Sequence, residues 1–180
     1  MIWAWGGDAM RDRFTFVLTG FMACGKTTIL KKLKKEQQLA SYEFYDLDEE
    51  IEKDSNKTVS EIIEDLGMEY FRVLERGHLR NLILGATRHR IISLGGGAID
   101  SEALNFLRKN KVSIIWINTP FEECLARIKQ DPNTRPLSRL DDESLKSLYL
   151  KRSAFYEQSD LSVSIDQEQK LISFITSSTI

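Results

Sequence analysis

The sequence is poor in the residues that mark several specialised classes of protein. It has only 2 cysteines, 3 prolines and 10 glycines among 180 residues. Cys24 and Cys124 lie far apart without the spacing of a metal site, and a small secreted fold stapled by disulfides would carry more cysteines. We therefore expect reduced thiols in a chain that is neither collagen-like nor low in complexity.

Long apolar runs and an excess of one charge are also missing. No apolar run approaches the roughly 18 residues that a membrane-spanning helix requires, and residues 1–10 lack the basic and apolar regions of a secretory signal. Lys and Arg total 25 against 27 Asp and Glu, so the basic excess of a nucleic-acid binder is absent. We expect a cytoplasmic protein without nucleic-acid or membrane partners, in which any bound anion is held by a local cluster.

What remains is an ordinary globular composition, 42% hydrophobic and 29% charged, at the length of a single domain. Apolar runs of strand length alternate with longer segments of helical period. This pattern predicts an α/β domain, a three-layer sandwich around a five-stranded parallel sheet. The expected strands are residues 14–19, a short strand around 44–45, 90–94, 112–117 and 161–165. The expected helices are residues 26–38, 47–54, 59–66, 69–84, a segment before Lys111, one beginning near Pro120, 143–156 and 167–175.

Two segments fall outside this alternation. Residues 1–10 precede the first strand, and we expect them to be a flexible extension of the one domain, residues 1–180. Residues 130–142 are polar and contain two prolines, which predicts a mobile loop. In a parallel sheet of this kind, ligands bind outside the carboxyl ends of the strands, so functional residues are sought there.

The first expected strand is followed by a phosphate-binding pattern. Residues 20–27 read G-F-M-A-C-G-K-T, which fits G-x-x-x-x-G-K-[ST] between a strand and a helix. Backbone N–H groups of such a loop and the helix N-terminus attract phosphate oxygens. Lys26 is expected to reach the β and γ phosphates, and Thr27 to offer its hydroxyl to Mg²⁺. The ATP-binding residues expected from this loop are Ala23, Cys24, Gly25, Lys26, Thr27 and Thr28. The alternative is a chance glycine-rich turn.

Cys24 within this loop has two interpretations. The positive field of the helix N-terminus would lower the pKa of its thiol and make it reactive. Alternatively, it is a buried small hydrophobic residue.

Charged residues follow at other strand ends and on helices. Asp46 and Asp48 come directly after the second strand, where one could hold Mg²⁺ through water and the other bind an acceptor hydroxyl. Their alternative role is to cap a helix. Arg72 and Glu75 are three residues apart on a helix, so they form either an exposed ion pair or a pair in which Glu75 orients Arg72 toward a substrate carboxylate.

A triple glycine, Gly95 to Gly97, ends the third strand, where bare backbone N–H groups can approach a ligand or simply form a tight turn. Arg135 lies in the polar loop, and Arg152 lies on the last long helix. Taken singly, each arginine is a solvated charge as often as a ligand.

Together these segments resemble shikimate kinases, from about Phe14 to Ile165. The motifs that carry the resemblance are G-F-M-A-C-G-K-T-T at residues 20–28, Asp46-Leu47-Asp48, Phe71-Arg72 with Glu75, S-L-G-G-G-A at residues 93–98, Arg135-Pro136-Leu137, and Lys151-Arg152 with Tyr156. One departure is Ala23, where the family commonly has a second glycine.

The resemblance implies a role for each matching residue. It places Asp48, Arg72, Gly95, Gly96, Gly97 and Arg152 around shikimate, Thr27 and Asp46 at Mg²⁺, Arg127 against the adenine of ATP, and Arg135 on a lid over the phosphates. Catalysis would then rest on Lys26, Asp48 and Arg135. It further implies the fold of the P-loop NTPases and nucleoside monophosphate kinases, with a lid at residues 130–142, and we expect a monomer.

The implied activity is transfer of the γ-phosphate of ATP to the 3-hydroxyl of shikimate, with Mg²⁺, in the biosynthesis of aromatic amino acids. The chemistry of the residues agrees, because guanidinium groups bind carboxylates and a carboxylate accepts hydroxyl hydrogen bonds. Another P-loop small-molecule kinase, such as a gluconate kinase, is the alternative. A regulatory GTPase would need N-K-x-D, and residues 56–59 read N-K-T-V.

Overall fold

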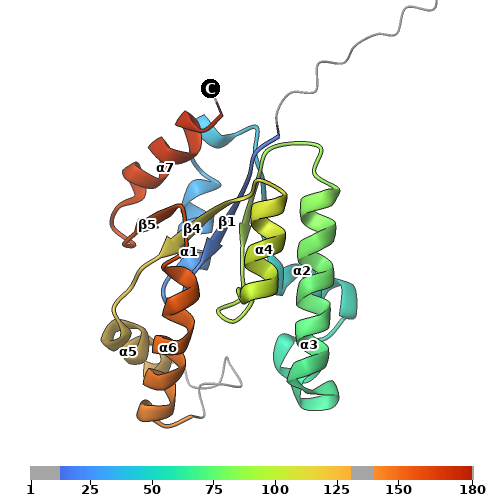
Figure 1. The fold of residues 1–180 in the computed structure, drawn as a ribbon, viewed down its shortest axis with the longest axis vertical. Helices are drawn as coiled ribbons and strands as arrows, with labels where there is room; N and C mark the ends of the chain where they lie inside the picture. Colours follow the sequence, from blue (N-terminus) through green and yellow to red (C-terminus); the bar gives the residue numbers. More distant parts are fainter. Residues whose placement is uncertain (1–12, 131–139, 180) are drawn as a thin grey trace, which may run out of the picture.

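A computed structural model describes residues 13–130 and 140–179 (Figure 1). Its strands are β1 (Thr15–Thr19), β2 (Glu43–Asp46), β3 (Arg90–Ser93), β4 (Ser113–Ile117) and β5 (Leu161–Val163). Its helices are α1 (Lys26–Leu33), the 3₁₀ turn η1 (Gln37–Leu39), α2 (Leu47–Ser55), α3 (Val59–Leu84), α4 (Ser101–Lys109), α5 (Phe121–Gln130), α6 (Asp142–Tyr156) and α7 (Glu168–Ser177). Among the described residues, no helix combines the length and apolar character that a membrane crossing requires.

The five strands form one parallel sheet in the order β2-β3-β1-β4-β5, with β1 at its centre. From β1 the chain runs to the β2 edge, returns to β3 beside β1, and then continues on the other side through β4 and β5. The strand order therefore reverses at β1. In open α/β sheets this is the point at which ligands bind, outside the carboxyl ends of the strands.

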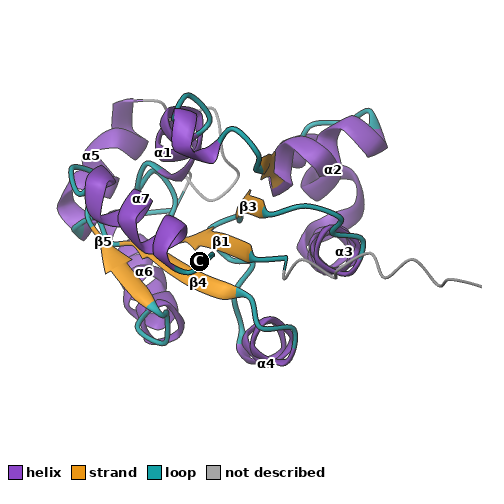
Figure 2. Cartoon of the chain, turned by 90° about the horizontal axis from the view of Figure 1, so that it is seen from above, coloured by secondary structure: helices purple, strands orange, loops and turns teal. Residues whose placement is uncertain are grey.

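Both faces of the sheet are covered, because alternate residues of β1 point into different cores. Phe16 and Leu18 pack in a core with residues of α1, α5 and α7, whereas Val17 packs in a second core with residues of α2, α3 and α4. Seen from above, α1 and α7 lie on one side of the sheet and α3 and α4 on the other (Figure 2). The three-layer α/β sandwich with five parallel strands is thus confirmed.

Some boundaries differ from those expected. The predicted helix 26–38 ends at Leu33, and a separate 3₁₀ turn follows at residues 37–39. The buried stripe of α1, which includes Ile29 and Leu33, would continue at Glu36 and Gln37, and these polar residues have nothing to bury. The fifth strand ends at Val163 rather than at residue 165. The break expected between residues 66 and 69 is present, because Gly67 has non-helical dihedral angles within α3.

Candidate functional site

The loop between β1 and α1 has the backbone that phosphate binding requires. Gly25 is the N-cap of α1 with a φ of 103°, and Ala23 also has a positive φ, 58°. L-residues other than glycine pay an energetic cost in this left-handed region. The second glycine that the resemblance implies at this position would adopt such a φ without strain, whereas this chain adopts it with an alanine.

Lys26 lies folded into this loop. Its side chain is 7% exposed, and Nζ donates to the carbonyls of Gly20 and Phe21 at 2.8 and 2.9 Å. The ammonium group is therefore already at the phosphate-binding loop, where it would meet an incoming phosphate.

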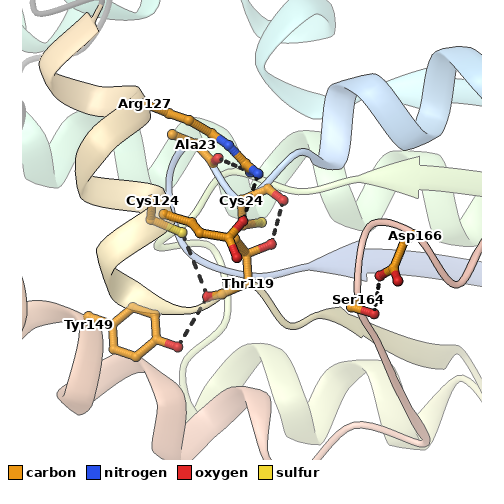
Figure 3. Close-up of polar contacts among 9 residues, drawn as sticks. Ala23, Cys24, Thr119, Cys124, Arg127, Tyr149, Ser164 and Asp166 are labelled. Atoms are coloured by element: carbon orange, nitrogen blue, oxygen red, sulfur yellow. Dashed lines mark hydrogen bonds and ion pairs between the residues drawn. The ribbon is translucent and has the colours of Figure 1, made fainter.

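The outer side of the loop is held by α5 and the segment before it (Figure 3). Arg127 Nη1 donates to the Ala23 carbonyl at 3.1 Å, and Thr119 Oγ1 donates to the Cys24 carbonyl at 2.8 Å. Thr119 is in turn held through its own carbonyl, which accepts from the Tyr149 hydroxyl at 3.2 Å. Two successive loop carbonyls are thus engaged from outside. Thr119 was not singled out in the sequence, because a threonine before a proline carries no motif.

Both cysteines are fully buried and free. Cys24 is therefore accommodated as a small hydrophobic residue, the second of its two interpretations. Burial raises the pKa of the Cys124 thiol to about 12, and its Sγ donates to the Thr119 carbonyl at 3.7 Å. In this pocket a neutral thiol serves as packing.

Asp46 combines the two roles that the sequence left open. Its Oδ1 accepts from the Asp48 backbone N–H at 3.2 Å and so caps α2, while its Oδ2 accepts from Thr27 Oγ1 at 3.1 Å. Two oxygen-bearing side chains, one from the end of β2 and one from the first turn of α1, are therefore in contact beside the phosphate-binding loop. This is the donor type that Mg²⁺ prefers.

Two cavities meet at this end of the sheet. One, about 400 Å³, is lined by the phosphate-binding loop together with other residues: Ala23, Gly25, Lys26, Thr27, Thr28, Asp46, Asp48, Ser93, Leu94, Gly95, Arg127 and Ile165. We call it the phosphate pocket. The other, about 150 Å³, is lined by Met22, Asp48, Glu52, Val59, Ile63, Met68, Phe71, Arg72, Glu75, Gly95, Gly96, Gly97 and Arg152. We call it the acceptor pocket. Asp48 and Gly95 line both, so they stand where the two pockets join.

Arg72 and Glu75 form a buried pair in the acceptor pocket rather than an exposed one. Arg72 Nη1 donates to Glu75 Oε2, and the Glu75 side chain is only 2% exposed. Burial raises the pKa of the Glu75 carboxyl above its ordinary value, although the charge of Arg72 opposes the shift. Because Glu75 fixes one side of the guanidinium, Arg72 is held in a defined orientation at the pocket wall.

At two of the three glycines, a side chain would crowd the charged groups of the acceptor pocket. A Cβ at Gly95 would overlap Glu75 Oε1 and lie 3.1 Å from Asp48 Oδ1. A Cβ at Gly97 would overlap Arg72 and lie 2.7 Å from Arg152 Nη2. Bare backbone here allows two carboxylates and two guanidinium groups to crowd around one loop.

Arg152 completes the acceptor pocket from α6. Its guanidinium carbon lies 5.8 Å from the centre of the Phe21 ring, so the side chain spans from α6 toward the phosphate-binding loop. Burial lowers the pKa of Arg152, which nonetheless stays charged near neutral pH because a guanidinium starts far above it. On the same helix, the Tyr156 hydroxyl donates to the Gly96 carbonyl, a contact that the sequence motif alone did not reveal.

The predicted site residues thus gather at one edge of the sheet, with a single exception. Arg135 lies outside the described residues, as do residues 131–139 of the expected lid and residues 1–12 at the start of the chain. Arg127 lines the phosphate pocket, and its second guanidinium nitrogen pairs with Glu123 at 3.0 Å.

A parallel sheet whose strand order reverses at a phosphate-binding loop, beside a second pocket walled by guanidinium groups, defines a kinase of the P-loop fold. The model of the shikimate kinase family matches residues 22–178. The chain belongs to the shikimate kinase family and is an ATP-dependent phosphotransferase.

Individual relatives agree. A shikimate kinase of Persephonella marina is 34% identical over 150 residues, which cover 83% of this chain and 87% of that protein. The crystal structure of shikimate kinase from Aquifex aeolicus is 33% identical with a TM-score of 0.76, and the match covers 92% of this chain and 95% of that one. Shikimate kinase from Acinetobacter baumannii in complex with shikimate is 28% identical with a TM-score of 0.80, over 94% of this chain and 97% of that one.

Proposed function

We propose that this protein transfers the γ-phosphoryl group of ATP to the 3-hydroxyl of shikimate, giving shikimate 3-phosphate and ADP. The observation that carries the proposal is the junction of the two pockets at Asp48 and Gly95. A nucleotide held by the phosphate-binding loop and an acceptor held by the guanidinium groups would meet there. Phosphoryl transfer depends chiefly on such positioning and on stabilisation of charge.

The acceptor pocket suits a small hydroxylated carboxylate. Arg72 and Arg152 present two guanidinium groups, which bind a carboxylate through paired hydrogen bonds. Asp48 stands at the opening toward the phosphate pocket, where a substrate hydroxyl would have to lie in order to be phosphorylated. In this proposal Asp48 accepts a hydrogen bond from that hydroxyl and takes its proton.

The phosphate pocket suits ATP with Mg²⁺. Thr27 and Asp46 would hold the ion, since both offer oxygen atoms beside the loop. When bound, Mg²⁺ supplies positive charge to the phosphates. Among the described residues, no group of three or more His, Cys, Asp or Glu side chains is placed to hold a metal ion.

The remaining residues complete the proposal. Lys26 would neutralise the transferring phosphate, and Arg127 would pack on the adenine. Arg135 stays a predicted phosphate ligand, since it lies outside the described residues. A cytoplasmic location and a monomeric state likewise remain predictions.

An assay of ADP formation tests the proposed function. With MgATP present, turnover should require shikimate and should be abolished when Mg²⁺ is removed with a chelator. Gluconate and AMP serve as competing acceptors, because other P-loop kinases phosphorylate acceptors of these types. Equal ADP formation with and without shikimate, or faster turnover with gluconate, would overturn the proposal.

A further inference from the structure

The loop at Gly95, Gly96 and Gly97 poses a problem of conformational control. Three successive glycines have more backbone freedom than any other tripeptide, yet they form a wall of the acceptor pocket. One hydrogen bond closes the turn internally, from the Ala98 backbone N–H to the Gly95 carbonyl at 3.1 Å. The peptide unit between Gly96 and Gly97 lies within that turn, and its orientation must be set by groups outside the loop.

Tyr156 contacts this peptide unit from α6. Its hydroxyl donates to the Gly96 carbonyl, and its side chain is 1% exposed. The ring is held against Trp116 of β4, with ring centres 6.0 Å apart. Burial raises the pKa of the Tyr156 phenol, and the charges of Arg152 and Arg72 act in the opposite direction. The phenol therefore keeps its proton at neutral pH and can donate it to the carbonyl.

The orientation of the carbonyl determines the orientation of the next N–H. The described chain has no cis peptide bond, and in a planar trans peptide the C=O and the following N–H point in opposite directions. With the Gly96 carbonyl bound to Tyr156, the Gly97 N–H points away from Tyr156. Gly97 itself lies against the guanidinium groups of Arg72 and Arg152. Tyr156 thus fixes the orientation of the N–H of a residue that borders both guanidinium groups.

We propose that Tyr156 is a positioning residue for the acceptor: it locks the Gly96–Gly97 peptide so that the loop presents a fixed N–H beside Arg72 and Arg152. The inference rests on the proposed function and adds to it the residue that orders the glycine loop. Tyr156 touches the loop and not the phosphate pocket, so its effect should fall on shikimate alone.

The substitution Tyr156→Phe tests the inference because it removes one oxygen atom and keeps the ring. Losing the donor leaves a buried carbonyl unpaired and lets the peptide rotate. We expect the KM for shikimate to rise about tenfold, by the cost of one unmet buried hydrogen bond, while kcat at saturating shikimate and the KM for ATP change less than twofold.

Tyr42→Phe is the control, because it also removes one tyrosine hydroxyl and keeps the ring. The Tyr42 hydroxyl donates to Thr179 Oγ1 at 3.3 Å, and neither residue lines the acceptor pocket or the phosphate pocket. Both variants lose one tyrosine hydrogen bond, so both should lower Tm by a few degrees. Only Tyr156→Phe should raise the KM for shikimate. A role in stability alone would lower Tm in both variants and leave the KM for shikimate unchanged in both.

A shikimate analogue tests whether the effect of Tyr156→Phe on KM depends on the carboxylate of the acceptor. In a shikimate analogue with hydroxymethyl in place of the carboxylate, the groups around Gly97 lose their charged partner. The ratio of KM between Tyr156→Phe and the wild type should fall from about ten toward one. If the wild type shows no shikimate-dependent turnover, the proposed function fails and this inference with it. If the wild type turns over shikimate but Tyr156→Phe behaves like Tyr42→Phe, or raises both KM values together, only this inference fails.

Discussion

The phosphate pocket and the acceptor pocket share a wall but are assembled in different ways. In the first, Lys26 reaches carbonyls five and six residues away in the same loop. In the second, Tyr156 reaches a carbonyl 60 residues away, and the two guanidinium groups come from α3 and α6. A phosphate site can be built from local backbone, because phosphate needs N–H groups and one cation. A site for a shaped acceptor needs side chains from several directions.

Because of this difference, we expect substitutions in the two pockets to change different kinetic constants. Changes in the phosphate pocket should act on kcat and ATP, whereas changes in the acceptor pocket should act on shikimate.

The largest effect is expected for Lys26→Ala. Removing a charge that acts on the transferring phosphoryl group should lower kcat by roughly 10² to 10³, or about 3 to 4 kcal/mol. Shikimate affinity, measured by titration without nucleotide, should change less than twofold. A kcat within threefold of the wild type would show that the lysine only braces the loop carbonyls that it contacts here.

Arg72→Ala should have the next largest effect. It removes a charge-assisted contact to the acceptor and leaves Glu75 buried without its partner, so shikimate binding should weaken by about 2 to 3 kcal/mol, on the order of 30-fold to 150-fold. The KM for ATP should barely change. Arg80→Ala is the matched control, because Arg80 lies on the same helix and pairs with Glu102 outside both pockets. If Arg72→Ala lost as much affinity for ATP as for shikimate, the separation of the two pockets would be contradicted.

Glu75→Gln should change how stability depends on pH. The pKa of Glu75 is raised in the folded protein, mainly by burial, above its ordinary value of 4.5. Between these two pKa values the folded state binds more protons than the unfolded state, so the free energy of unfolding falls as pH rises through that window. Arg72, Asp48 and Arg152 set the size of the shift.

In Glu75→Gln this fall should be absent. The free energy of unfolding of the wild type should therefore fall relative to that of the variant as pH rises through the window, and the difference between the two should be constant outside it. Urea unfolding at a series of pH values from 4 upward measures the difference. Identical slopes for the two proteins would mean that Glu75 titrates normally.

The smallest effect is expected for Ala23→Gly. A residue with a φ of 58° is strained by its Cβ, so glycine should raise the free energy of unfolding by about 0.5 to 1 kcal/mol. Ala126→Gly, at an exposed position within α5, should instead lower it by about 1 kcal/mol. The urea concentration at the midpoint of unfolding, compared at constant m-value, measures the change in the free energy of unfolding for both variants. A loss of stability in Ala23→Gly would mean that the stiffer backbone of alanine stabilises the folded protein more than the strain of its positive φ destabilises it.

Much of the fold could be predicted from the sequence, because each element carries its own local signal. The alternation of apolar strands with amphipathic helices gave the layers, and the glycine break at Gly67 was visible as an interruption. Some predicted boundaries were wrong: α1 ends at Leu33, because its next turn has nothing apolar to bury.

The sequence by itself determined the phosphate-binding loop, since eight consecutive residues encode both its backbone and its cation. It also placed Asp46 and Asp48 at a strand end, on the side of a parallel sheet where that loop lies. Only the tertiary structure decided that Arg72 and Glu75 form a buried pair, that Gly97 lies between two guanidinium groups, and that Tyr156 holds the Gly96 carbonyl. These contacts join elements far apart in the chain. Their existence depends on how helices pack on the sheet, a geometry that no single segment encodes.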